Sequence, residues 1–300
     1  MNEKSIVIIT GTDGHLGTGH FQRMCTLAYH LNLTSSYNAK IVIKSGNPAI
    51  PPQVENFISP DIPSTASLVI RDMRDSTEED IRLLKKTAPV LVIDDTGPGR
   101  GAADFIIALL PSPVSANPSN GMFIYGYNFI NSIRNMSLHE FIKDIDVSIY
   151  AGYDPDMDYV ERLLQAIPPK ASVVLFNKNR PVELSGKGLP IGAYADTLLR
   201  SRVLITHFGI TMYEGELAGC TVVLVNPSPY HSELTRLAGR KLELIPAGEY
   251  QEINHKLIHS VVSANLKEKK LRIISSRSIN ERINISLDYL ISHINRICNN

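Results

Sequence analysis

Short apolar runs alternate with longer amphipathic stretches along most of this 300-residue chain. The runs are rich in Val and Ile, which favour strands, and stretches such as 20–31 have the apolar spacing of a helix. This alternation is typical of βα units around mostly parallel sheets, so we expect an α/β fold. The expected strands are 5–9, 40–43, 67–70, 90–93, 105–109, 123–125, 147–150, 172–176, 203–206, 222–225 and 242–245.

The pattern restarts near residues 132–144, where a helix over 137–143 is expected to precede a new series of strands. A chain of this length is also long enough for two cores. We therefore predict two facing Rossmann-like domains, 1–136 and 137–300, the second ending in a helix over 278–297. Ligands of such sheets bind at the carboxyl ends of the strands, where we look for chemistry.

Charge and cysteine content exclude several functions. The 30 Lys and Arg residues balance 30 Asp and Glu residues, so we expect no nucleic-acid or membrane-surface partner. No run of about 18 apolar residues occurs, which argues against stable membrane insertion. The cysteines Cys25, Cys220 and Cys298 lie far apart without metal-ligand spacing. Their pattern suits a reducing compartment, and we expect a cytoplasmic protein.

A glycine-rich turn follows the first strand and runs into the first helix. Gly17 and Gly19 let the backbone come close to a ligand, and the free N–H groups of a helix start favour an anion. The stretch resembles the dinucleotide fingerprint, but Gln22 stands where its third glycine is needed. We therefore expect neither NAD nor any other cofactor.

His20 stands at the start of that helix. The positive end of the helix dipole disfavours imidazolium, and a neutral imidazole can act as a base. The alternative is that His20 only packs or bonds a neighbouring loop. Arg23, one turn further on, either reaches the same pocket or is solvated.

Two adjacent carboxylates, Asp94 and Asp95, follow the strand at 90–93. They could bind a substrate hydroxyl or orient His20. The alternative is that one caps the following turn while the other is solvated. Without a third ligand in the sequence we predict no metal.

The second half carries two further candidate anion sites. Gly152 follows the strand at 147–150, and Asp154 with Pro155 is typical of a helix N-cap and first helical residue. His231 lies near the start of another helix, after the strand at 222–225. It either flanks a nucleotide or simply belongs to that helix.

A third segment combines Gly209, Thr211 and Glu214 after the strand at 203–206. Gly209 makes a turn and Thr211 opens a helix. Thr211 and Glu214 have the spacing of a capping box, so Glu214 is either a helix cap or an acceptor for the ribose hydroxyls of a nucleotide.

Taken in order, these motifs resemble the UDP-sugar hydrolase of pseudaminic acid biosynthesis, which is similar in turn to GT-B glycosyltransferases. The resemblance covers roughly residues 5–245. The motifs are Gly17-x-Gly19-His20-x-x-Arg23, Asp94-Asp95 followed by Ala103-Asp104, Ala151-Gly152-x-Asp154, and Gly209-x-Thr211-x-x-Glu214.

The resemblance implies a GT-B-like fold in which the second domain holds UDP and the first faces the sugar. It implies that His20 activates a water that attacks the anomeric carbon and that Glu214 holds the ribose. The amides around Gly152 and Thr211 would bind the diphosphate. The chain departs from the family pattern at Ala151-Gly152-Tyr153, at Tyr230-His231 and at the strand end Arg71-Asp72-Met73-Arg74. These departures fall around the sugar and the nucleotide, so the family's sugar is not carried over.

Three functions remain open from the sequence. A nucleotide-sugar hydrolase needs only water as acceptor. A GT-B glycosyltransferase would use the same UDP-sugar donor with a second acceptor. A binding protein would keep the fold without turnover. The UDP-sugar is the expected partner in each case.

Overall fold

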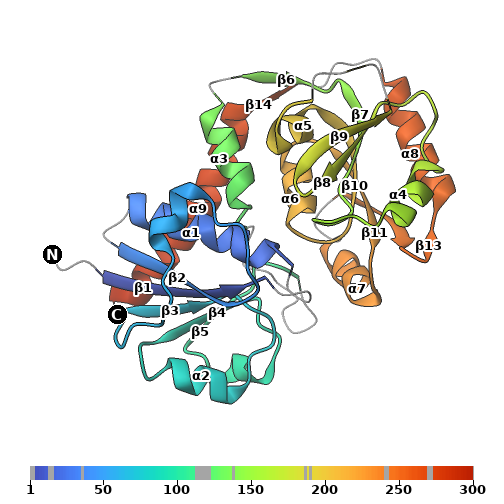
Figure 1. Ribbon diagram of the computed structural model, residues 1–300. Coiled ribbons are helices and arrows are strands. Elements are labelled where there is room, and N and C mark those ends of the chain that lie inside the picture. Colours follow the sequence, from blue (N-terminus) through green and yellow to red (C-terminus); the bar gives the residue numbers. More distant parts are fainter. Residues whose placement is uncertain are drawn as a thin grey trace. The chain divides into compact units, whose positions relative to one another are not determined.

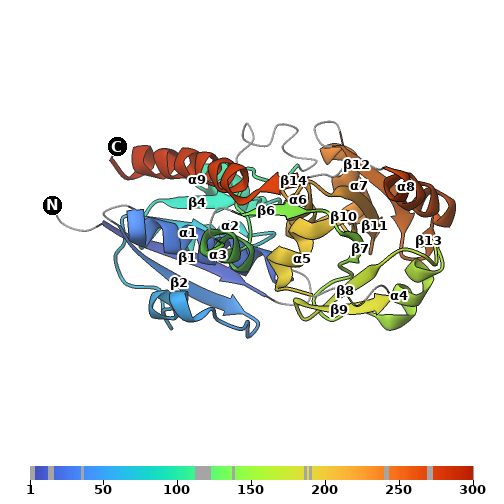
Figure 2. The same cartoon turned by 90° about the horizontal axis from the view of Figure 1, so that it is seen from above.

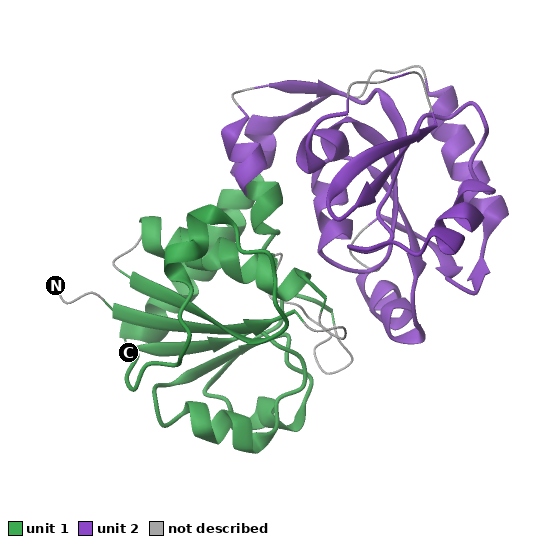
Figure 3. Cartoon of the chain, viewed as in Figure 1, with its two compact units in different colours: residues 1–130, 282–300 green, residues 131–281 purple. Residues whose placement is uncertain are grey.

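The structure, a computed structural model, describes residues 4–12, 17–34, 37–111, 123–136, 139–185, 188, 191–239, 243–268 and 273–299. The chain divides into two compact units (Figure 3). Unit 1 comprises Met1–Ile130 and Arg282–Asn300, and unit 2 comprises Asn131–Glu281.

Unit 1 is built on a parallel sheet of strand order β2-β1-β3-β4-β5 (Figure 1). Its strands are β1 Lys4–Gly11, β2 Tyr37–Ser45, β3 Leu68–Arg71, β4 Val90–Ile93 and β5 Phe105–Ile107. Ile6, Val7 and Ile8 of β1 are all fully buried, although successive side chains point to opposite faces. Both faces of the sheet are therefore covered, as expected for parallel strands.

Four helices accompany this sheet in the described part of unit 1. They are α1 Gly19–Thr34, α2 Glu78–Leu84, α3 Tyr127–Asn135, which contains the division between the units, and most of α9 Ser276–Asn299. α2 begins with a capping box formed by Thr77 and Asp80. α9 lies beside α1, since Nε2 of His30 in α1 is 3.8 Å from Oδ1 of Asp288 in α9 (Figure 2).

The final helix belongs to unit 1 from Arg282 onward, whereas the sequence assigned 278–297 to the second domain. Ile283, Leu287 and Ile294 of α9 are buried. Ser286 Oγ also donates to the carbonyl of Phe123. The amphipathic pattern predicts that a helix forms here, but not which of two cores it covers.

Unit 2 has a sheet of strand order β13-β12-β11-β10-β7-β8-β9, parallel except at the two edge strands β13 and β9. The strands are β7 Ile145–Ile149, β8 Val173–Asn177, β9 Arg180–Ser185, β10 Ser201–Thr206, β11 Thr221–Asn226, β12 Leu244–Glu249 and β13 Glu252–Ile253. The expected strands at 147–150, 172–176, 203–206 and 222–225 fall on β7, β8, β10 and β11. Leu242 of the expected strand at 242–245 lies outside the described residues.

The helices described in unit 2 are α4 Met157–Leu164, α5 Tyr194–Arg200, α6 Ile210–Leu217, α7 Pro229–Ala238 and α8 His255–Lys267. A core cluster includes Val147, Tyr159, Val203 and Val262, so it joins the central strands to α4 and α8. A small antiparallel pair joins β6 Glu140–Ile142 to β14 Ile273–Ser275.

Three local predictions were wrong. Residues 123–125 form no strand, because Ser286 bonds the backbone of Phe123 and Thr26 Oγ1 bonds the carbonyl of Tyr125. The helix expected over 137–143 is not found, because β6 pairs with the distant β14 within that stretch; Ser137 and Leu138 lie outside the described residues. α4 is capped by Asp156, whose side chain accepts from the N–H of Asp158, and so begins later than expected.

Candidate functional site

His20 and Asp72 come together at the carboxyl edge of the unit 1 sheet. His20 lies in the first turn of α1, and Asp72 directly follows β3. β3 is the neighbour of β1, and the N–H of Asp72 donates to the carbonyl of Ile9, 2.9 Å away. The parallel pairing therefore brings Asp72 to the beginning of α1. Both side chains are buried, with 7% of His20 and none of Asp72 exposed.

The two side chains share a hydrogen bond of 2.8 Å between His20 Nδ1 and Asp72 Oδ1. An ionised carboxylate only accepts, so this bond assigns the proton of the neutral ring to Nδ1. Nη2 of Arg23 also lies 3.2 Å from Nδ1, but it already donates to Asp72, and the carboxylate contact is shorter. The second ring nitrogen, Nε2, then carries the lone pair that a base needs.

Arg23 links Asp72 to Asp94. Its Nε donates to Asp72 Oδ2 at 2.6 Å, and its Nη1 lies 2.7 Å from Asp94 Oδ2. Only 2% of the Arg23 side chain is exposed, so it is not solvated. Burial opposes its charge, but Asp72 and Asp94 outweigh burial and raise the pKa of Arg23 above its usual value.

The two carboxylates respond in opposite directions to the same surroundings. Burial alone would raise the pKa of Asp72, but Arg23 and His20 outweigh it and lower that pKa to about 2. For Asp94 burial prevails over Arg23, with Asp72 adding repulsion, so its pKa is raised. Asp94 Oδ1 also accepts from the N–H groups of Leu109 and Leu110. Asp94 thus links Arg23 to the segment that follows β5.

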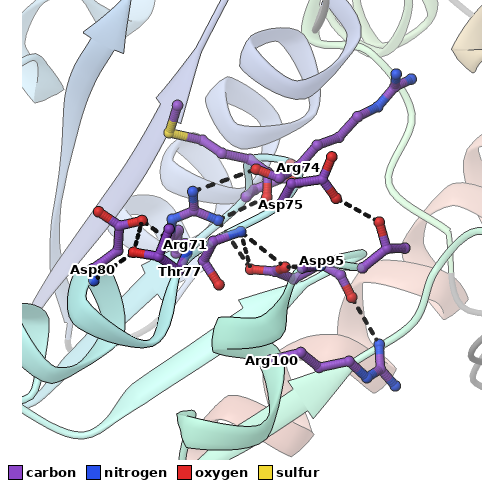
Figure 4. Close-up of polar contacts among 12 residues, drawn as sticks. Arg71, Arg74, Asp75, Thr77, Asp80, Asp95 and Arg100 are labelled. Carbon is purple, nitrogen blue, oxygen red and sulfur yellow. Dashed lines mark hydrogen bonds and ion pairs between the residues drawn. The ribbon is translucent and has the colours of Figure 1, made fainter.

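Asp95 has a structural environment (Figure 4). Its side chain is fully buried and accepts from the N–H groups of Ser76 and Gly97 and from Arg71 Nη1. Arg100 donates to its carbonyl. These bonds hold the loops after β3 and β4 together, which favours a scaffold role over the substrate contact expected from the sequence.

Gly17 and Gly19 lie at the end of the glycine-rich turn, where α1 begins. Gly17 has φ +65°, a conformation that L side chains rarely adopt, and Gly19 is the first residue of α1. Residues 13–16 lie outside the described residues. Gly17 thus allows the sharp entry that places His20 in the first turn of the helix.

In unit 2 the predicted glycines also occupy turns after parallel strands. Gly152 follows β7 with φ +99°, and Gly209 follows β10 as the N-cap of α6. None of the described side chains caps this helix end, so the capping box considered as one alternative for Thr211 and Glu214 does not form. The start of α6 therefore has the positive end of its dipole at the sheet edge.

Glu214 is instead buried, with 3% exposed, and its Oε2 accepts a 2.6 Å hydrogen bond from Tyr194 Oη. The same hydroxyl lies 3.3 Å from Thr211 Oγ1. Tyr194 comes from the first turn of α5. Three polar side chains from two helices therefore gather next to the N-terminal end of α6.

Two histidines lie beside this group. His231 Nδ1 is 2.8 Å from Ser228 Oγ, and the rings of His231 and His207 are 6.1 Å apart. His207 Nδ1 is buried without a hydrogen-bond partner among the described residues. Burial, with a smaller contribution from His231, lowers the pKa of His207 to about 4. His207 is therefore a neutral side chain near pH 7.

Sequence reasoning missed Asp72, Tyr194 and His207. Asp72 stands in the stretch Arg71-Asp72-Met73-Arg74 at the end of an expected strand, which was noted as a departure from the family pattern. A polar residue at a strand end was the available signal for Asp72 and His207. Tyr194 is the first residue of a helix, and nothing near it in the sequence indicates a contact with Glu214.

Within the described residues, no cluster of three or more His, Cys, Asp or Glu side chains has the geometry to hold a metal ion. None of the helices in that part of the chain is long and apolar enough to cross a membrane.

No protein-family model and no curated protein matches the chain. Solved structures match over nearly its whole length. The glycotransferase of kitacinnamycin has 11% identity and a TM-score of 0.56, covering 98% of this chain and 99% of that one. MnaA of S. aureus, solved with UDP, has 11% identity and a TM-score of 0.52, covering 99% and 97%. UDP-GlcNAc 2-epimerase from Neisseria meningitidis, bound to UDP-GlcNAc, has 9% identity and a TM-score of 0.51, covering 97% and 100%.

The chain has a GT-B fold. The expectation of an α/β fold of GT-B type with mostly parallel sheets is thereby confirmed. In each Rossmann-like unit of this GT-B chain, the candidate side chains follow the carboxyl ends of parallel strands. His20, Asp72 and Asp94 do so in unit 1, and Gly152 and His207 in unit 2.

Proposed function

We propose that the chain is a nucleotide-sugar hydrolase that releases UDP from a UDP-activated sugar, as its resemblance to the hydrolase of pseudaminic acid biosynthesis implies. The observation that carries the proposal is the buried pair of His20 and Asp72, with a 2.8 Å bond that directs the ring proton to Nδ1. A histidine oriented in this way by a carboxylate is suited to accept a proton at Nε2.

In the proposed reaction, His20 Nε2 takes a proton from water as the water oxygen attacks the anomeric carbon. The new C–O bond forms on one face of the sugar while the bond to the diphosphate oxygen breaks on the other, and UDP leaves with the electron pair. Asp72 stabilises the imidazolium that forms. Arg23 keeps Asp72 ionised, which its low pKa of about 2 supports.

Unit 2 is proposed to hold the nucleotide. Glu214 accepts hydrogen bonds from the ribose hydroxyls, which a carboxylate can do because its two oxygens offer about four acceptor positions. The N–H groups after Gly209 and near Gly152 bind the diphosphate, at a helix end that no side chain caps. Thr211 and the ring of His207 lie at the same helix start. His231 lies next to His207 and is assigned to the same site.

The solved structures support a UDP-containing ligand, since MnaA was solved with UDP and the epimerase with UDP-GlcNAc. The likeness to the kitacinnamycin glycotransferase favours a second candidate, transfer of the sugar to another acceptor. Both reactions use the same donor and the same base, so the acceptor distinguishes them.

The first experiment is thermal unfolding with UDP, CMP, GDP and ADP in parallel. A ligand at a hundred times its dissociation constant stabilises the native state by ~2.7 kcal/mol, a shift of several degrees. A shift with UDP alone supports the proposal. No shift with any nucleotide would remove its premise, and a shift with another nucleotide would change the donor.

The second experiment measures UDP release from a panel of UDP-sugars without an added acceptor. His20→Asn should leave UDP affinity nearly unchanged and lower turnover by ~10²–10⁴, the usual contribution of a general base. His30→Asn is the matched control, because His30 lies on the same helix but is paired with Asp288 of α9. Release that requires an acceptor would favour the glycosyltransferase, and equal turnover in both variants would exclude His20 as the base.

A further inference from the structure

Tyr194 donates a hydrogen bond to Glu214. The two residues lie on different helices, α5 and α6, and the distance from Tyr194 Oη to Glu214 Oε2 is 2.6 Å. Hydrogen bonds to an ionised acceptor are shorter and stronger than neutral ones. A buried carboxylate needs such donors, since burial without them is costly.

The hydroxyl of Tyr194 is held in place by its ring. The ring lies edge-on to Phe176, with centroids 4.9 Å apart, and 6.3 Å from the ring of Tyr150. Phe176 is fully buried in β8, so this contact ties the start of α5 to the sheet. Burial, with Glu214 and Tyr150 adding to it, raises the pKa of Tyr194 well above its usual value. The hydroxyl therefore keeps its proton and remains a donor.

The bond leaves the carboxylate few rotamers. One oxygen of Glu214 is directed at a fixed donor, and the side chain lies among Tyr194 and Thr211 at the start of α6. Binding groups held by their neighbours lose less conformational freedom on binding, and they discriminate better between similar ligands.

We infer that Tyr194 is a positioning residue that fixes the carboxylate of Glu214 for the ribose hydroxyls, and thereby sets the preference for a ribonucleotide over its 2′-deoxy analogue. This inference rests on the proposed binding of UDP in unit 2. Tyr194 itself acts through Glu214 and takes no part in bond breaking.

The test compares dissociation constants of UDP and 2′-deoxy-UDP by calorimetry. Tyr194→Phe keeps the ring and its contact with Phe176 but removes the hydroxyl. We expect it to reduce the preference for UDP by roughly 3- to 10-fold, which is less than the full contribution of a hydrogen bond to a charged group because Tyr194 acts only through Glu214. Glu214→Gln should reduce the preference at least as much, and the double variant should add little to it.

Tyr159→Phe is the matched control, because Tyr159 is a buried tyrosine of the same unit whose ring stacks on Tyr250. It should leave the preference unchanged. If Glu214→Gln loses the preference while Tyr194→Phe keeps it, the inference is overturned and the proposed function stands. If the unaltered protein binds neither nucleotide, both are overturned.

Discussion

His20 Nδ1 lies 2.8 Å from Oδ1 of Asp72, and the carboxylate is itself held by two nitrogens of Arg23. The histidine is thus oriented by a group whose own position is fixed. Because Asp72 sits beyond β3 and His20 beyond β1, the orientation depends on the pairing of those two strands. A change in the pairing of β1 and β3 would therefore also change the orientation of His20.

Replacing Asp72 by Asn should lower turnover strongly while leaving UDP affinity unchanged. The amide no longer stabilises an imidazolium and can hold the wrong tautomer of His20, a change that costs ~10⁴ in the Ser-His-Asp triad. Steady-state rates and calorimetric affinities measure the two effects separately. Asp75→Asn, at an exposed carboxylate three residues away that accepts from Thr96, is the control. Full turnover in Asp72→Asn would show that His20 works without its carboxylate.

Arg23→Met should destabilise unit 1 by about 3–5 kcal/mol, because it leaves two buried carboxylates without their cation. Urea unfolding followed by circular dichroism measures this loss. Adding Asp94→Asn should recover part of it, since one unpaired carboxylate is then neutral. Arg82→Met, which breaks an exposed pair with Glu78, should cost at most about 1 kcal/mol. Equal losses in the two arginine variants would contradict the bridging role of Arg23.

His207 should make stability depend on pH between about 6.5 and 4. The pKa of His207 is lowered to about 4 in the folded chain, while an unfolded histidine titrates near 6.5. Between these values the unfolded chain binds the additional proton, so the stabilisation is complete above about pH 6.5 and is lost as pH falls toward 4. Urea unfolding at several pH values should show a shallower dependence in His207→Asn. An identical dependence would mean that His207 is protonated in the folded state.

Leu287→Ala in α9 should weaken unit 1 and leave unit 2 intact. Leu287 is 1% exposed, and removing such a side chain costs about 2–5 kcal/mol. Hydrogen exchange should become faster in β1 and β4 but not in β10. Tyr289→Ala on the same helix is the control, because Tyr289 is 51% exposed. Faster exchange in β10 as well would place the unfolding of both units in one cooperative step.

The parallel strands of both sheets were predictable because their residues carry the pattern locally, whereas the antiparallel edge strands β9 and β13 were not predicted. Val90–Ile93 and Val203–Thr206 are apolar runs between turn signals, and buried parallel strands have that composition. Residues 123–125 are also apolar, but they form no strand in the structure. The side chains of Ser286 and Thr26 satisfy their backbone, and both lie far away in sequence.

The sheet-edge positions of the candidate residues were predictable where glycine turns and helix starts mark them, as for His20 and Gly209. They were not predictable where two elements meet. Asp72 reaches His20 through the pairing of β3 with β1, and Glu214 finds its partner Tyr194 on a different helix, α5. The spacing of Thr211 and Glu214 would allow a local capping box, but in the structure Glu214 bonds Tyr194.

Unit 1 is assembled from two stretches of chain, Met1–Ile130 and Arg282–Asn300, with all of unit 2 between them. During synthesis unit 2 therefore leaves the ribosome before unit 1 has received its last helix. At 5–20 residues per second the intervening stretch takes roughly 8–30 s to make. For that time the apolar surface that α9 later covers is open to chaperones or to other nascent chains. Unit 2, although it starts later in the sequence, can therefore complete its folding before unit 1.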